Sequence, residues 1–346
     1  MRKTILVTGG TGYVGSWIVK YLLEKDYRVR ITVRDKSKTS KYAFLQEIAD
    51  KSDGVIEVYE ADLLTPGAFD SAAEDSDAII HVASPFTLRF KDAVNEIIKP
   101  AINGTQNVLN AATSSATVKK VVLTSSVAAV YGDNIEMQEK GIREFTEDDF
   151  NDTSSETHQP YSYSKVKAEL RAWELARQQE QWKLVVMNPG FVMGPLLDTN
   201  SNSESIQFMK DMLTGKFLTG APHLEFGFVD VRDVAKAHIL ALEEEKAIGR
   251  YILIKEVMSF IGFAKKIKVI YPGKYPLPLM KAPKFMLYLI GRAFGITSRF
   301  VSRNIGYHIK INNSKGQKEL GLVYSPIETT IEDMVESMKE LKIIKS

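Results

Sequence analysis

A tyrosine followed four residues later by a lysine occurs twice in one short stretch, as Tyr161 with Lys165 and as Tyr163 with Lys167. On a helix this spacing places both side chains of a pair on one face. An ammonium group beside a phenol favours the phenolate, so we expect the lysine to lower the tyrosine pKa from about 10 toward neutrality. Such a tyrosine can give a proton to a carbonyl oxygen or take one back. The spacing alone does not choose between the two pairs.

Three hydroxyl residues, Thr124, Ser125 and Ser126, end the apolar run that starts at Lys120. If this run is a strand of a parallel sheet, its carboxyl end is where a ligand lies. A hydroxyl group there can hydrogen-bond a substrate oxygen and stabilise the charge that builds on it. A single serine at a strand end is more often structural, and it gains weight here from the tyrosine–lysine pairs and from a glycine-rich turn.

That turn follows Thr4–Thr8, which we expect to be a short buried strand, and it precedes an amphipathic helix. Gly9 allows a tight turn, Gly12 lets the backbone approach a pyrophosphate, and Gly15 lets the helix pack closely. The amide groups at the helix N-terminus then face an anion. This order of strand, turn and helix predicts a dinucleotide-binding site. The alternative is a turn with a purely structural role.

Apolar strands alternate with helices through the first half of the chain. The expected strands are Thr4–Thr8, Arg28–Arg34, Val55–Tyr59, Ala78–Val82, Lys120–Thr124 and Lys183–Met187, and a long helix is expected over about Asp92–Thr113. The alternation indicates an α/β fold built on a doubly wound parallel sheet of the Rossmann type, with helices on both faces.

After Gly194 the pattern loosens. The features expected there are a polar loop at Asp198–Ser203, a stretch Phe228–Asp233 that leads into a helix through Glu245, a last strand at Arg250–Ile254, and helices near Lys284–Phe294 and Glu328–Leu341. We therefore expect residues 1–190, joined by about 227–255, to form the dinucleotide-binding domain. Residues 191–226 and 256–346 would form a smaller, interleaved C-terminal substrate-binding lobe.

Composition excludes several classes of function. The chain has 346 residues, of which 44% are hydrophobic and 25% charged, as in an ordinary soluble globular protein. Its net charge of +2 gives no reason to expect a nucleic-acid partner or an anionic membrane. Without cysteine there are no disulfides and no thiolate metal sites, and no metal is expected. No apolar run reaches about 18 residues, so we expect no membrane span and a cytoplasmic protein.

Motifs spread over about the first 245 residues resemble those of a known family. They are Thr8–Gly15, Thr32–Asp35, Ala61–Leu63, His81–Pro85, Asn103–Thr105, Thr124–Ser126, Tyr161–Lys165, Asn188–Gly190, Gly194–Pro195 and Phe228–Ala235. On these motifs the chain is identified as a member of the extended short-chain dehydrogenases/reductases. It is most similar to the group of dihydroflavonol 4-reductases, cinnamoyl-CoA reductases and methylglyoxal (aldehyde) reductases.

The resemblance selects one tyrosine–lysine pair. In the family, serine-lysine is followed by two variable residues and alanine-glutamate, as Lys165 is followed here by Ala168 and Glu169. This implies that Tyr161 and Lys165 are catalytic, with Ser126 as the hydroxyl group of the triad. Tyr163 would then line the substrate side or simply pack, and the chain would be an NAD(P)H-dependent oxidoreductase acting on alcohol and carbonyl groups.

The resemblance also implies a set of cofactor contacts. Asp62 and Leu63 would hold the adenine, Ala83 would lie against the cofactor, and Pro189 with Val192 would flank the nicotinamide. The remaining expected contacts are Thr8, Gly9, Gly12, Tyr13, Val14, Gly15, Arg34, Lys41, Val82, Ser84, Thr124, Tyr161 and Lys165. His81 is expected to be a satisfied strand histidine without a catalytic role.

The end of the second strand bears on the choice of cofactor. NAD-preferring relatives have an acid there that binds the ribose hydroxyls. Here Val33 fills that place and Arg34 follows, and a guanidinium suits a 2′-phosphate. Lys41 matches a second basic position of the plant reductases. We therefore expect NADPH (NADP+) to be preferred, while Asp35 leaves NADH use open. The alternative is that both cations are solvated surface charges.

These observations favour an NADPH-dependent carbonyl reductase that converts an aldehyde or ketone to an alcohol, as a monomer or homodimer. Phe86, Tyr163 and Phe191 are the expected substrate contacts. Three alternatives stay open: an NAD-dependent sugar-nucleotide epimerase or dehydratase, a 3β-hydroxysteroid dehydrogenase-like enzyme, and a dinucleotide-sensing protein without catalysis. The basic, apolar stretch 281–294 is expected to be a lid helix, or else a contact with a membrane surface.

Overall fold

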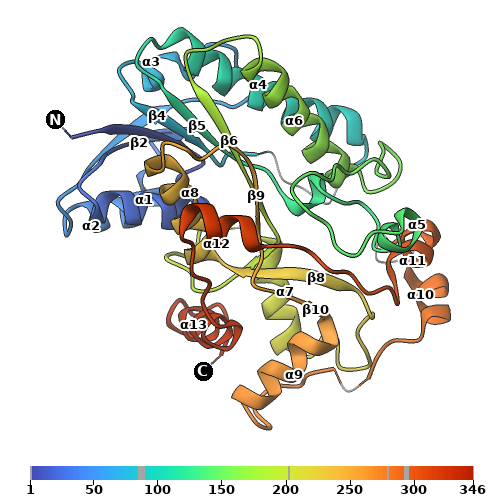
Figure 1. Cartoon of the computed structure of the whole chain (residues 1–346). Coiled ribbons are helices and arrows are strands. Elements are labelled where there is room, and N and C mark those ends of the chain that lie inside the picture. Colours follow the sequence, from blue (N-terminus) through green and yellow to red (C-terminus); the bar gives the residue numbers. More distant parts are fainter. Residues whose placement is uncertain (1, 85–89, 202, 279, 292–295, 346) are drawn as a thin grey trace.

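Seven parallel strands form the large sheet of the computed structural model, which describes residues 2–84, 90–201, 203–278, 280–291 and 296–345 (Figure 1). In the order β3-β2-β1-β4-β5-β6-β9 they are Val55–Glu60, Arg28–Val33, Thr4–Thr8, Ala78–His81, Lys120–Thr124, Lys183–Pro189 and Gly249–Leu253. The strand order reverses between β1 and β4, and ligands of such sheets bind in the crevice at this point. The expected Rossmann-type α/β fold is confirmed.

Successive residues of the central strands β1 and β4 fall into two separate cores, one on each face of the sheet. Ile5, Val7 and Ile80 belong to the core beneath α1 (Tyr13–Glu24), whereas Leu6 and Ile79 belong to the other core. Side chains alternate along a strand, so a sheet buried on both faces needs an almost continuous apolar run. This is why the strands of the large sheet were recognisable in the sequence.

Helices cover both faces (Figure 1). On the α1 side lie α2 (Ala43–Ala49) and α8 (Val231–Glu243), and on the other side α3 (Asp70–Ala73), α4 (Lys99–Ser114) and α6 (Pro160–Ala176). The long helix expected from Asp92 begins with a π-helical turn, Val94–Ile98, and continues as α4. Shorter helical segments are Thr39–Lys41, Val127–Ala129 and α5 (Glu136–Lys140).

A second, three-stranded sheet has the order β10-β8-β7, with β8 (Glu225–Asp230) parallel to β7 (Phe191–Met193) and antiparallel to β10 (Glu256–Ser259). The expectation that the strand near Arg250–Ile254 is the last one is wrong, because β10 follows it after two residues. The helices of this part of the chain are α7 (Glu204–Leu213), α9 (Phe260–Ile270), α10 (Lys284–Ile290), α11 (Ser298–Asn304), α12 (Ser314–Leu320) and α13 (Ile327–Glu340).

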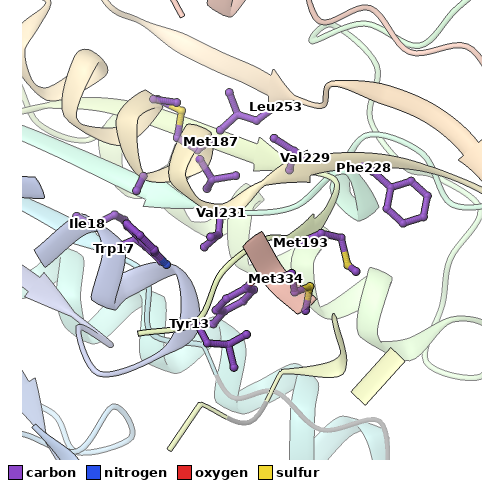
Figure 2. Packing of buried hydrophobic residues seen from close by; sticks show 14 of the residues in the cluster. Tyr13, Trp17, Ile18, Met187, Met193, Phe228, Val229, Val231, Leu253 and Met334 are labelled. Atoms are coloured by element: carbon purple, nitrogen blue, oxygen red, sulfur yellow. The ribbon is translucent and has the colours of Figure 1, made fainter. Parts of the chain in front are cut away.

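The C-terminal part of the chain packs directly against the start of α1. Figure 2 shows Tyr13, Met193 and Met334 together in one buried cluster. The Tyr13 hydroxyl donates a hydrogen bond to the Gly194 carbonyl at 2.5 Å, and the Trp17 indole donates to the Pro195 carbonyl at 2.9 Å. The helix that follows the glycine turn is therefore fixed by residues far along the chain.

The stretch expected as a helix over 281–294 forms α10, and residues 292–295 lie outside the described part of the chain. Leu287 packs with Val301 and Ile305, whereas the side chains of Phe285 and Leu289 are exposed. One face of α10 thus docks on α11. Within the described ranges, none of the helices combines the length and the apolar character needed to cross a bilayer.

Candidate active site

A cavity of about 1960 Å³ extends along the carboxyl ends of the large sheet, from the glycine turn to the small sheet. Almost all of the sequence-predicted site residues line it. The exceptions are Thr8 and Tyr163, which the structure places elsewhere, and Phe86, which lies outside the described residues. Residues from distant parts of the sequence therefore meet in one continuous space.

Thr8 lies beneath the glycine turn instead of facing the cavity. Its side chain is fully buried, its hydroxyl shares a 2.7 Å hydrogen bond with His81 Nδ1, and it accepts another from the Ala83 amide at 3.3 Å. Burial lowers the pKa of His81 to about 3, so the imidazole is neutral at pH 7. Both side chains hold the end of β4 against the turn.

The glycine turn has little room for side chains. Gly9 has φ +70°, and a Cβ on it would lie 2.8 Å from the Ala83 amide nitrogen. A Cβ on Gly15 would lie only 2.1 Å from the Gly9 carbonyl oxygen. Helix α1 begins at Tyr13, so its first amides have no intrahelical partners. Because Gly12–Gly15 line the cavity, this end of α1 is suited to an anion.

Replacing Gly15 with alanine is expected to lower the free energy of unfolding by about 1–3 kcal/mol, because the added methyl group must displace the backbone of the turn. The affinity for NADPH should fall as well. Gly316→Ala is the matched control, since a Cβ there meets nothing closer than 3.7 Å in α12. Denaturant unfolding and fluorescence titration with NADPH measure both effects. Equal stability and affinity in the two variants would contradict the packing described for the turn.

The end of the cavity next to the carboxyl end of β2 is basic, and we refer to it as the basic end. Arg34, Lys38 and Lys41 line it, and Lys38 was missed because only its neighbours matched a family position. Asp35 is held by the Ser37 hydroxyl at 2.5 Å and by Lys38 at 3.1 Å. The hydrogen bond from Ser37, followed by the one from Lys38, keeps the pKa of Asp35 below its usual value. Among the described residues, neither Arg34 nor Lys41 takes part in an ion pair.

Leu63 is positioned by α4. The Asn107 amide donates a hydrogen bond to the Leu63 carbonyl at 3.0 Å. A Cβ on Gly104 would lie 2.4 Å from the Leu63 side chain, so only a glycine permits this close contact. The neighbouring Asp62 accepts a hydrogen bond from the Leu64 amide at 2.8 Å. These contacts fix the positions of Asp62 and Leu63, against which we expect the adenine to lie.

Helix α6 presents one tyrosine–lysine pair to the cavity. Tyr161 and Lys165 line it, whereas Tyr163 lies two residues on, about 200° around the helix. Lys167 Nζ lies 5.0 Å from the centre of the Tyr163 ring, so the two side chains of the second pair contact each other. The geometry distinguishes two pairs that spacing alone left equal.

The environment of Tyr161 shifts its pKa in the opposite direction to the one expected. Burial of the phenol raises the pKa of Tyr161 to about 12, and a hydrogen bond with Ser126 only partly offsets this. The Lys165 Nζ lies 5.9 Å from the centre of the ring. The charge of the lysine is visible in the sequence, whereas the loss of water around the phenol depends on the fold. At neutral pH the Tyr161 side chain is therefore protonated and able to donate.

Lys165 is itself buried. Its Nζ donates a hydrogen bond to the Ser84 hydroxyl at 3.1 Å, at the carboxyl end of β4. Burial lowers the pKa of Lys165 to about 8, although the charge of Glu169 opposes this shift. Lys165 therefore lies at the cavity wall between α6 and β4, and the negative charge of Glu169 partly compensates its positive charge.

The two adjacent serines have different surroundings. Ser126 lines the cavity and accepts a hydrogen bond from the Ala128 amide at 3.1 Å, whereas Ser125 donates to Glu169 at 2.5 Å. The Asn188 amide donates both to the Ser126 carbonyl at 3.0 Å and to Glu169 at 2.9 Å. Arg250 Nε lies 2.7 Å from Glu169. A buried ionic network behind the wall thus fixes the backbone at Ser126.

Replacing Glu169 with alanine is expected to destabilise the fold by about 3–5 kcal/mol, because the Arg250 charge is 6% exposed and would lose its partner. Glu174→Ala on the same helix is the control. Its side chain is 53% exposed and pairs with Arg171, so a loss of at most about 1 kcal/mol is expected. Urea unfolding measures both values, and similar losses would contradict the importance of the buried network.

The wall of the cavity next to the small sheet combines apolar and polar groups. Phe191 packs against Phe226 with ring centres 6.0 Å apart, and both line the cavity, as does Phe300. Polar residues there include Asn134, His158, Gln159 and Asn304. Of these residues only Phe191 is predicted from the sequence, because the others come from separate segments without a motif.

The side chain of Thr124, the last residue of β5, forms a hydrogen bond inside the fold. Thr124 lines the cavity, but its hydroxyl shares a 2.7 Å hydrogen bond with His238. Burial lowers the pKa of His238 to about 4, so this imidazole is neutral. Thr124 therefore offers the cavity mainly its backbone.

Comparison with known proteins is consistent with this geometry. The model of the NAD dependent epimerase/dehydratase family matches residues 5–254. A cinnamoyl-CoA reductase of Medicago truncatula is 34% identical, over 99% of this chain and 97% of its own. The solved structure of the yeast methylglyoxal/isovaleraldehyde reductase Gre2 with NADPH is 25% identical, with a TM-score of 0.77 over 98% of this chain and 99% of its own. The corresponding NADPH complex of Candida albicans is 28% identical, with a TM-score of 0.76 and the same coverage.

Proposed function

The chain belongs to the NAD dependent epimerase/dehydratase family, and on that premise we propose that it is an NADPH-dependent reductase of aldehydes or ketones. Within the family it is an NAD(P)H-dependent oxidoreductase of the extended short-chain dehydrogenase/reductase group, similar to the dihydroflavonol, cinnamoyl-CoA and Gre2-type reductases. One observation carries the proposal. Tyr161, hydrogen-bonded to Ser126, shares the wall of a single cavity with Lys165 and the glycine turn.

The residues present fit a dinucleotide. The start of α1 offers amides without intrahelical partners, and Gly9, Gly12 and Gly15 bring the backbone of the turn to the wall of the cavity without side chains. Arg34, Lys38 and Lys41 would hold a 2′-phosphate at the basic end, which supports NADPH over NADH. Asp62 and Leu63 would bind the adenine, and Pro189 with Val192 would flank the nicotinamide.

We assign the chemistry of the chain to three side chains. When bound, the reduced nicotinamide supplies a hydride to the carbonyl carbon. Tyr161 donates its phenolic proton to the carbonyl oxygen, and its raised pKa keeps that proton in place at neutral pH. Ser126 hydrogen-bonds the same oxygen and stabilises its developing charge. Lys165 holds the cofactor ribose and places a positive charge near the phenol when Tyr161 is deprotonated.

We propose that residues 1–190 and the returning segment with α8 and β9 bind the cofactor, and that the remainder forms the substrate-binding lobe. The pairing of β9 with β6 and the packing of α8 on α1 support this division. Because β8 belongs to the small sheet, we propose that the returning segment starts after Asp230. Phe191, Phe226 and Phe300 favour a substrate with an apolar part.

The proposed function is tested by NADPH and NADH oxidation with aliphatic, aromatic and α-dicarbonyl compounds. We expect turnover of at least one class, with kcat/KM higher for NADPH. Turnover with NADH alone would overturn the assignment of the basic end. NADPH binding without turnover of any compound would instead favour a dinucleotide-sensing protein, and turnover of nucleoside-diphosphate sugars alone would favour an epimerase or dehydratase.

A further inference from the structure

The histidines of this chain divide into two groups. Three of the five are buried and hydrogen-bonded inside the fold, namely His81, His158 and His238. The other two, His223 and His308, come from segments 85 residues apart in the sequence, and their ring centres are 5.3 Å from each other. A carboxylate, Glu225, lies with them.

The donor atoms of these three side chains are close enough to share one ion. Glu225 Oε1 lies 2.7 Å from His308 Nδ1 and 3.7 Å from His223 Nε2, and all three donor atoms are within 4.8 Å of one another. Tetrahedral zinc, with ligands at about 2.0–2.1 Å, separates its donor atoms by roughly 3.3 Å. The two distances to Glu225 lie on either side of that value. The His308 side chain is 80% exposed, so it can turn to adjust its position.

The carboxylate is already oriented by the fold. Glu225 is nearly buried, its Oε2 accepts a hydrogen bond from the Ile309 amide at 3.1 Å, and the His223 carbonyl accepts one from the Gly306 amide at 2.8 Å. These bonds join the start of β8 to the segment after α11. Outer hydrogen bonds that fix a ligand in this way are a common feature of metal sites.

The cluster lies apart from the cavity. Leu224 and Phe226, the neighbours of Glu225, line the cavity, and alternate side chains of a strand point to opposite faces. The charge of Lys281 acts on His223 and opposes a cation, but its side chain is exposed and therefore screened by solvent. Two imidazoles and one carboxylate are a donor set that zinc commonly takes in proteins.

We propose that His223, Glu225 and His308 form a binding site for a divalent transition metal such as Zn²⁺, with the remaining coordination position left to water. The metal would connect β8 to the segment after α11 and so fix the outer side of the substrate-binding wall. The site is separate from the proposed reaction, which needs no metal. Its presence or absence is therefore independent of whether the carbonyl reductase assignment holds.

The test is calorimetric titration of the full chain, free of any histidine tag, with Zn²⁺ alone in a non-chelating buffer. We expect one ion per chain and an affinity that falls at least about tenfold in His223→Gln and in His308→Gln. Glu174→Gln is the control for surface carboxylates and should bind as the wild type does. Circular dichroism checks that each variant is folded.

A second measurement uses Co²⁺ in place of Zn²⁺. The wild type should develop the visible absorption bands of a low-coordinate cobalt site, and both histidine variants should lose them. The proposal is overturned if the wild type binds no ion stoichiometrically. It is also overturned if both folded histidine variants bind Zn²⁺ as tightly as the wild type.

Discussion

Replacing Tyr161 with phenylalanine is expected to lower kcat for carbonyl reduction by about 10²–10⁴-fold, the usual contribution of a positioned general acid. The variant keeps the ring and loses only the hydroxyl group that donates the proton. It also loses the hydrogen bond with Ser126, which is a small change for the fold. Steady-state NADPH oxidation with the best carbonyl substrate measures the effect, and thermal unfolding shows whether the fold is intact.

Tyr163→Phe is the matched control for this experiment. Tyr163 lies on the same helix, two residues away, but does not line the cavity. Its substitution should leave kcat within a few-fold of the wild type, since the residue is not in contact with the cavity in which the reaction is proposed to occur. If Tyr163→Phe abolished turnover while Tyr161→Phe did not, the proton donor would have to be reassigned.

Replacing Arg34 with alanine is expected to lower kcat/KM for NADPH by roughly 10–100-fold and to leave kcat/KM for NADH nearly unchanged. A hydrogen bond to a charged group contributes about 1.5–3 kcal/mol, and every 1.4 kcal/mol corresponds to a factor of ten. Only NADPH carries the 2′-phosphate, so only its binding should suffer. Initial rates with both cofactors give the ratio directly.

Lys36→Ala is the control for Arg34. Lys36 lies in the same basic loop and is exposed, but it does not line the cavity. Loss of a general positive charge would affect both variants alike, whereas a phosphate site affects Arg34 alone. An equal fall in kcat/KM for NADPH and for NADH in the Arg34 variant would show that the arginine does not bind the 2′-phosphate.

The large sheet was predictable because its strands are buried on both faces. Val121, Val122 and Leu123 are all buried, and such a run stands out without any partner being known. The small sheet gives no comparable signal. β7 has three residues and is separated from β6 by Gly190 alone, so in the sequence it cannot be distinguished from a loop. Its pairing with β8, more than thirty residues later, depends on contacts that a local pattern does not contain.

The site was predictable where a motif or a spacing defined it. The glycine turn and the Tyr161–Lys165 pair are local features, and both line the cavity. Lys38, Asn134 and Asn304 were missed because they reach the cavity from segments without a motif. The direction of the Tyr161 pKa shift was also missed. It depends on how many atoms surround the phenol, and the fold determines that number.

The most direct test of the account is to follow the hydride and the proton together. NADPH deuterated at both C4 positions is supplied with the best carbonyl substrate, and the product alcohol is examined by mass spectrometry and NMR. We predict one deuterium on the carbinol carbon in the wild type and a much slower formation of the same product in Tyr161→Phe. Product without deuterium, or undiminished formation in Tyr161→Phe, would contradict the account.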